Sequence, residues 1–81
     1  MQVRVRLFAR AREAYGASRA DLELPPGATL RDCFRELSAE APALARMEDA
    51  LLVARNEVYA GWEDSLQEGD EVALIPPVSG G

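Results

Sequence analysis

Residues 3–8 read VRVRLF and residues 20–24 read ADLEL, and these two stretches decide the fold. In both, apolar and charged side chains alternate, which is typical of a β-strand with one buried face and one solvent-exposed face. The polar residues between them lead to Gly16-Ala17, which we interpret as a turn, so the two strands should form a hairpin. Pro25-Pro26-Gly27 ends the second strand.

A helix is predicted directly after this hairpin. Its apolar residues recur at the i, i+3, i+4, i+7 spacing of a single helix face, namely Leu30, Cys33, Phe34 and Leu37. Thr29 is placed to cap the N-terminus of this helix, with Asp32 three positions later, and Pro42 should end it. The pattern therefore predicts a helix that packs one face against a sheet.

The second half of the chain supplies three more predicted strands. Residues 51–54 read as a buried strand, residues 57–60 as a short edge strand, and residues 71–75 as the last strand, halted by Pro76-Pro77. Residues 43–47 suit a short helical turn. The order ββαβββ is that of an α+β β-grasp domain, in which the first and last strands lie side by side in a mixed sheet. We expect this domain over residues 1–75, followed by an extended tail over residues 76–81.

Composition narrows the classes of function. The 81 residues, 48% of them hydrophobic, fit one small domain whose core is too small to enclose a large ligand pocket. The net charge of −5 makes nucleic acid and anionic membranes poor partners. The chain has no His, no Lys and one cysteine, so we expect no metal site and no cofactor bound by the chain. No stretch resembles a signal peptide or a membrane span, so we expect a cytoplasmic protein.

The final residues carry the strongest functional signal. Pro76 and Pro77 cannot donate to a sheet ladder and favour an extended path, so Val78 and Ser79 should project from the domain toward Gly80-Gly81. Glycines without a Cβ could thread a narrow slot in a partner and place the Gly81 carboxyl at a reactive centre. We expect Gly81 to react and Gly80 to be needed for threading.

The chain resembles the small sulfur-carrier subunits of molybdopterin synthase, which belong to the ubiquitin-like proteins. The resemblance covers the whole chain and is carried by VRLFARARE at residues 5–13, VARN at 53–56, GDEVA at 69–73 and PPVSGG at 76–81. The last of these is the most specific. One departure is the additional charge that Arg4 and Arg6 bring to the first strand.

This resemblance implies a chemistry for the tail. A terminal carboxylate is an unreactive anion at neutral pH, so it must be activated. The resemblance implies that an E1-like enzyme uses ATP to adenylate Gly81 and that a sulfur donor converts the adenylate to a thiocarboxylate. The thiocarboxylate would enter the large synthase subunit, in a heterotetramer, and deliver sulfur to cyclic pyranopterin monophosphate. The chain is then no enzyme on its own, because the catalytic groups belong to the large subunit.

Strand parity predicts a surface for this partner. If Val3, Val5 and Leu7 face the helix, Phe8 points to the opposite face, and the same reasoning places Ile75 there. We expect Tyr59 on the short strand to extend this apolar surface. The resemblance implies that these positions, with residues 76–79, contact the large subunit.

Other interpretations stay open. A related carrier for thiamine, cysteine or tRNA thiolation would share the same tail, and a protein modifier attached to target lysines could share it too. Ordinary scattered surface residues could account for the apolar positions. Cys33 and Trp62 are interpreted as packing residues, and Arg10 and Arg12 as solvated charges or contacts to acidic groups on a partner.

Overall fold

A computed structural model describes residues 1–77 of the chain, in which the two alternating stretches form the predicted hairpin. β1 spans Gln2–Leu7 and β2 spans Arg19–Glu23, and the two strands pair antiparallel. The apolar residues of β1 are buried and its charged residues are exposed. The predicted tail residues Val78, Ser79, Gly80 and Gly81 lie outside the described residues.

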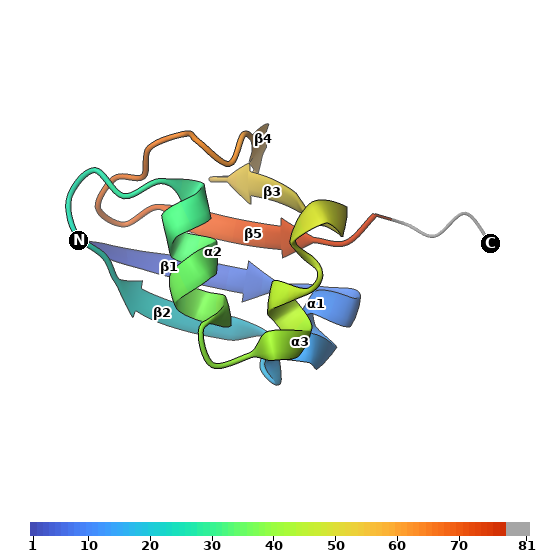
Figure 1. Ribbon diagram of the computed structural model, residues 1–81. Coiled ribbons are helices and arrows are strands. Elements are labelled where there is room, and N and C mark those ends of the chain that lie inside the picture. Colours follow the sequence, from blue (N-terminus) through green and yellow to red (C-terminus); the bar gives the residue numbers. More distant parts are fainter. Residues whose placement is uncertain (78–81) are drawn as a thin grey trace.

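The hairpin belongs to a five-stranded mixed sheet in the order β2-β1-β5-β3-β4. The later strands are β3 (Leu52–Arg55), β4 (Val58–Ala60) and β5 (Glu71–Ile75). β1 and β5 lie parallel at the centre, and every other neighbouring pair is antiparallel. This arrangement confirms the predicted β-grasp fold, with the first and last strands side by side (Figure 1).

The main helix, α2 (Leu30–Ser38), crosses one face of the sheet (Figure 1). Thr29 and Asp32 form the predicted cap reciprocally: the Asp32 backbone N–H donates to Thr29 Oγ1 at 3.2 Å, and the Thr29 N–H donates to Asp32 Oδ2 at 2.9 Å. Hydrogen bonding to the Asp32 carboxylate from Thr29, first from its backbone N–H and then from its side chain, holds the pKa of Asp32 below its ordinary value. The cap therefore fixes where the helix begins.

The helix ends earlier than Pro42, which begins another element. α2 ends at Ser38, and Pro42 is the first residue of α3 (Pro42–Ala45), a position where its missing N–H costs nothing. A single 3-10 turn, η1 (Glu48–Ala50), follows. The helical turn predicted over residues 43–47 is thus present, but it both starts and ends earlier, at Pro42 and Ala45.

One helix contradicts the sequence prediction. The segment between β1 and β2, interpreted above as a turn, contains α1 (Ala9–Tyr15). Its alanines, arginines and glutamate favour a helix, but only Ala11 is buried, so no apolar period marks it. Gly16 ends α1 with a φ of 97°, a left-handed conformation that glycine adopts readily, and its N–H donates to the Arg12 carbonyl at 2.8 Å.

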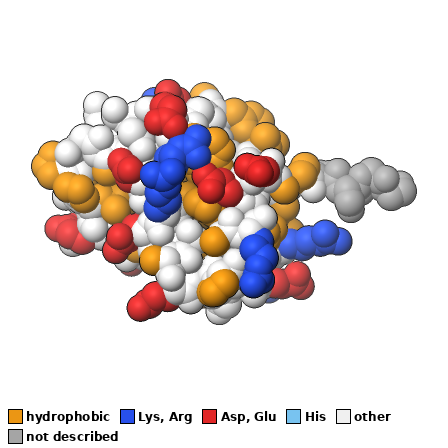
Figure 2. Space-filling model, viewed as in Figure 1, with side chains coloured by type: hydrophobic (Ala, Val, Ile, Leu, Met, Phe, Trp, Pro, Cys, Tyr) orange, Lys and Arg blue, Asp and Glu red, His pale blue; other side chains and the backbone are white. Residues whose placement is uncertain are grey.

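The core lies between α2 and the sheet. Its largest fully buried side chains are Phe34, Leu7, Leu30, Leu44, Leu74, Val5, Val72 and Cys33. Trp62 packs edge-on against Phe34 at 5.3 Å between ring centroids, which confirms its packing role. On the side covered by α2, acidic and basic side chains are interspersed (Figure 2). Within residues 1–77, no helix has the length and apolar character required to span a membrane.

Candidate functional site

The sheet face opposite α2 carries the predicted contact residues. Side chains alternate along a strand, so the positions between the core residues of β3, β4 and β5 point to this outer face. The strand register places Leu52 opposite Ile75, and Ala54 opposite both Ala73 and Tyr59. An apolar surface therefore continues across three strands.

The larger side chains of this surface form what we call the apolar patch, defined as Phe8, Leu52, Tyr59 and Ile75. Phe8 is 38% exposed, Leu52 48% and Tyr59 70%, whereas Ile75 is half-buried. Small side chains at Ala54 and Ala73 leave a hollow of about 260 Å³, which Phe8, Tyr59 and Ile75 also line. Exposed apolar side chains grouped around a hollow are typical of a protein contact surface.

Phe8 is held in this patch by its neighbours. It is the extended N-cap residue of α1, and its backbone N–H donates to the Leu74 carbonyl at 3.3 Å. The next residue, Ala9, has a φ of 48°, an uncommon conformation for a residue with a Cβ. The Arg6 guanidinium lies over the Phe8 ring, 5.1 Å from its centroid. These contacts keep the ring on the outer face.

The structure thus brings together the three predicted domain residues Phe8, Tyr59 and Ile75. The prediction of a buried strand over residues 51–54 is wrong for Leu52, which is exposed between the buried Leu51 and Val53. In an uninterrupted apolar run the sequence does not show which residues face the core. In the structure Val53 is paired with the core residue Leu74, so Val53 faces the core and Leu52 faces the opposite side. The predicted edge strand also begins at Val58 rather than at residue 57.

The tail leaves the domain at the edge of the apolar patch. Ile75 is the last residue of β5 and lies opposite Leu52 in the ladder. Pro76 is half-buried and Pro77 is exposed. Because neither proline has an N–H to donate, the ladder cannot continue through them. A protein that covers the patch would therefore also meet the root of the tail.

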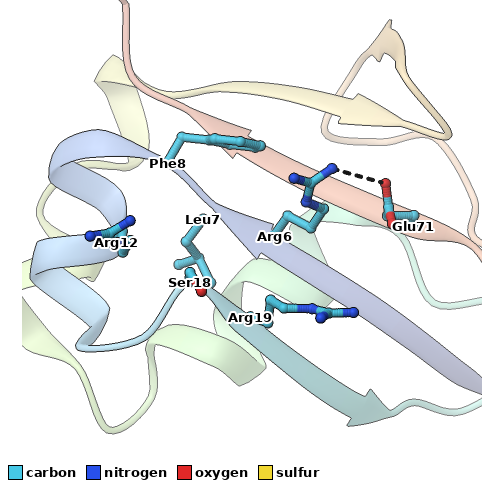
Figure 3. A pocket seen from close by; sticks show the side chains of 7 residues that line it. All are labelled: Arg6, Leu7, Phe8, Arg12, Ser18, Arg19 and Glu71. Atoms are coloured by element: carbon cyan, nitrogen blue, oxygen red, sulfur yellow. Dashed lines mark ion pairs between the residues drawn. The ribbon is translucent and has the colours of Figure 1, made fainter.

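A second hollow, of about 410 Å³, lies beside the first and shares Arg6, Phe8 and Glu71 with it (Figure 3). Arg12 from α1 and Arg19 from β2 line its remaining sides, together with Ser18. We call this hollow the arginine groove, after Arg6, Arg12 and Arg19. Arg10 lines neither hollow.

Burial raises the pKa of the Cys33 thiol to about 12, and the side chain is only 1% exposed, so it is a packing residue. In the part of the chain that the structure covers, no group of three His, Cys, Asp or Glu side chains could hold a metal ion. The predicted reactive residue Gly81 is outside this part.

Comparison with known proteins gives matches over nearly the whole chain. The profile of the ThiS family matches residues 5–81. The molybdopterin synthase sulfur carrier subunit of Arabidopsis thaliana is 40% identical over 81 residues, covering 100% of this chain and 84% of that relative. The protein of the same name from Chlamydomonas reinhardtii is 40% identical over 83 residues, covering 100% of both. The structure of SAMP1, a small archaeal modifier protein from Haloferax volcanii, is similar with a TM-score of 0.89 and 32% identity, covering 100% of both chains. The chain belongs to the ThiS family.

Proposed function

We propose that this chain is the sulfur-carrier subunit of a molybdopterin synthase. The observation that carries the proposal is the 40% identity, over the full chain, to relatives of that name. The β-grasp fold alone supports no function, because one fold serves many. The apolar patch at the root of the tail adds support, because a synthase subunit needs a surface for its partner subunit.

The proposed chemistry takes place at Gly81. Its carboxylate attacks the α-phosphate of ATP and pyrophosphate leaves, which gives an acyl-adenylate. Sulfide supplied by a donor then attacks the acyl carbon, AMP leaves, and a thiocarboxylate remains. The large subunit uses this sulfur on cyclic pyranopterin monophosphate, and two such transfers build the dithiolene of molybdopterin.

The chain needs partners for each of these steps. It has no Lys and no His, and its one thiol, on Cys33, is buried with a raised pKa. We assign ATP binding to an E1-like adenylating enzyme and the transfer chemistry to the large subunit, with no cofactor bound by this chain. The synthase is proposed to be a heterotetramer. A cytoplasmic location suits a protein with an unpaired cysteine.

The tail limits the distance to each reactive centre. An extended chain spans at most about 3.6 Å per residue, so the five residues after Pro76 reach about 18 Å. Both the adenylating site and the transfer site must therefore lie within about 18 Å of the patch edge when the partner is docked. In the docked complex Val78 and Ser79 would occupy the channel of the partner that leads to these sites, and Gly80 would occupy its narrowest part.

Mass spectrometry tests the proposal directly. Incubation with the activating enzyme of the same organism, ATP and a sulfur source should add about 16 Da, since sulfur replaces one oxygen. The control is a variant without Gly81, which should keep its melting temperature and gain no mass. An unchanged mass of the full chain, with an activating enzyme proven competent on its own carrier, would contradict the proposal.

A second candidate function is attachment to other proteins. The similarity to SAMP1, 32% identical over 100% of both chains, favours it. The sequence contains no Lys, so the chain could be attached singly to a target but could not form lysine-linked polymers. Tagged chain expressed in its own organism would show covalent conjugates of higher mass that disappear when Gly81 is deleted. Absence of such conjugates would leave the carrier function alone.

A further inference from the structure

The arginine groove contains a charge arrangement that works against the stability of the sheet. Arg6 in β1 and Arg19 in β2 are directly opposite each other in the antiparallel register. Like charges at such positions are destabilising, whereas opposite charges stabilise. The neighbouring outer-face pair has the favourable arrangement, because Arg4 is opposite Asp21 and their charged groups are 3.7 Å apart. The repulsive pair therefore needs an explanation that strand pairing does not supply.

The positive charge of the groove is poorly compensated within the domain. Across residues 1–77, no carboxylate lies within ion-pair distance of Arg12 or Arg19. Arg6 has one partner, Glu71, at 3.9 Å, a long separation for an ion pair. Elsewhere Arg31 holds both Glu48 and Glu63 at 2.6 and 2.7 Å. In a chain of net charge −5, the concentration of arginines in this groove is a local exception.

We propose that the arginine groove receives an acidic segment of the large synthase subunit, so that this subunit docks on the apolar patch and the groove together. The inference rests on the proposed function. Arg6, Phe8 and Glu71 line both hollows, so one partner surface can cover them continuously. In Figure 3 the Arg6 and Arg19 side chains project from neighbouring strands on the same side of the sheet. Two or more carboxylates in the groove could each form a bidentate ion pair with one of these arginines, which would offset the repulsion between Arg6 and Arg19.

The groove should act mainly on the rate of encounter. Complementary charges at the rim of an interface raise the association rate and make it dependent on salt, and they change the dissociation rate less. The apolar patch would then hold the complex after the charges have oriented it. We therefore expect the association rate to depend on salt concentration, and we expect this dependence to weaken when Arg19 is replaced.

Arg19→Gln is the informative substitution, because Arg6 also contacts Glu71 and the Phe8 ring. Association with the purified large subunit of the same organism should slow about 3- to 10-fold at about 50 mM salt. The difference from wild type should vanish at about 500 mM salt, where screening is nearly complete at this range. The melting temperature should stay equal or rise, because the substitution removes a like-charge pair.

Arg4→Gln is the matched control. It changes the net charge by the same amount on the same face of the sheet, but Arg4 is outside the groove and already paired with Asp21. Its association rate should stay within about twofold of wild type. Equal effects of the two substitutions would mean that only net charge matters, and unchanged binding of Arg19→Gln would also overturn the inference while leaving the proposed function intact. If wild type fails to bind the large subunit at all, both are wrong.

Two other occupants can be recognised by separate measurements. Inorganic phosphate that shifts the Arg12 and Arg19 guanidinium resonances at millimolar concentration would indicate a small-anion site. A salt-sensitive dimer in sedimentation that Arg19→Gln abolishes would indicate that a second copy of this acidic chain fills the groove. Either result would overturn the inference, and their absence together with the Arg19-specific rate effect would support it.

Discussion

Two adjacent residues of β4 allow a direct test of the apolar patch. Tyr59 and Val58 are 70% and 68% exposed, but they point to opposite faces of the sheet. Tyr59 lines the hollow of the patch. Val58 is paired with Arg55, and both are on the side of the sheet that faces the core. Of about 200 Å² of tyrosine surface, about 140 Å² is free. If a partner covers half, about 70 Å² at about 25 cal/mol/Å² gives about 1.8 kcal/mol, or about 20-fold in Kd.

Titration calorimetry with the large subunit should therefore show about 20-fold weaker binding for Tyr59→Ala and less than about twofold for Val58→Ala. Both residues are on a short edge strand, so each substitution should cost no more than about 1 kcal/mol of folding free energy. Melting curves verify that the two variants are equally folded. If both variants bind like wild type, or if Val58→Ala weakens binding as much as Tyr59→Ala, the assignment of the partner to the outer face is wrong.

Three further predictions concern the tail, the backbone at Ala9 and the cap of α2. Gly80→Ala should fold normally but lose adenylation, sulfur transfer or both, because a Cβ would block a narrow channel in the partner. ATP–pyrophosphate exchange measures adenylation, and single-turnover assays with chemically prepared thiocarboxylate measure sulfur transfer. Full activity in both assays would contradict the threading role of Gly80. Ala9→Val should lower the free energy of unfolding by about 1 to 2 kcal/mol in urea, because a β-branched residue tolerates its positive φ poorly, whereas Ala9→Gly should match wild type or exceed it. The folded pKa of Asp32 is lowered, so its stabilisation is present above the unfolded pKa of about 4 and is lost as pH falls through the lower folded pKa. The difference in melting temperature between wild type and Asp32→Asn should thus close in acid, and a constant difference would contradict the role of the charge.

The elements that the sequence predicts correctly are those in which the spacing of apolar residues matches the side chains that are buried in the structure. The period of Leu30, Cys33, Phe34 and Leu37 predicts α2 because all four side chains are buried on one face. The β-grasp order follows from that helix and the alternating strands around it. In contrast, α1 has a single buried residue, Ala11, so its helical conformation has no apolar period to reveal it.

The candidate site is only partly visible in the sequence for a related reason. Parity places Phe8 and Ile75 on the outer face, since the residue before each, Leu7 and Leu74, belongs to the core. Leu52 escapes this reasoning because Leu51 and Val53 around it are also apolar, and an uninterrupted run does not say which residue is exposed. The arginine groove depends on which residues of β1 and β2 are paired. In a tight hairpin the length of the turn fixes this register, but here the helix α1 connects the two strands, so the register cannot be read from the sequence.

The outer face thus carries the apolar patch over β3, β4 and β5 and, beside it, the arginine groove between β1, β2 and α1, and the tail leaves at the edge of the patch. In the proposed function a carrier reaches two reactive centres in turn, and the reach of about 18 Å from Pro76 would bring both partners to the same region. Two proteins that need one surface exclude each other, so each complex has to dissociate before the next step can begin. In this proposal a small apolar patch would limit the lifetime of each complex, and the groove would raise the rate of encounter with the large subunit without lengthening that lifetime. Dividing the face in this way lets the carrier associate quickly with a partner and still leave it.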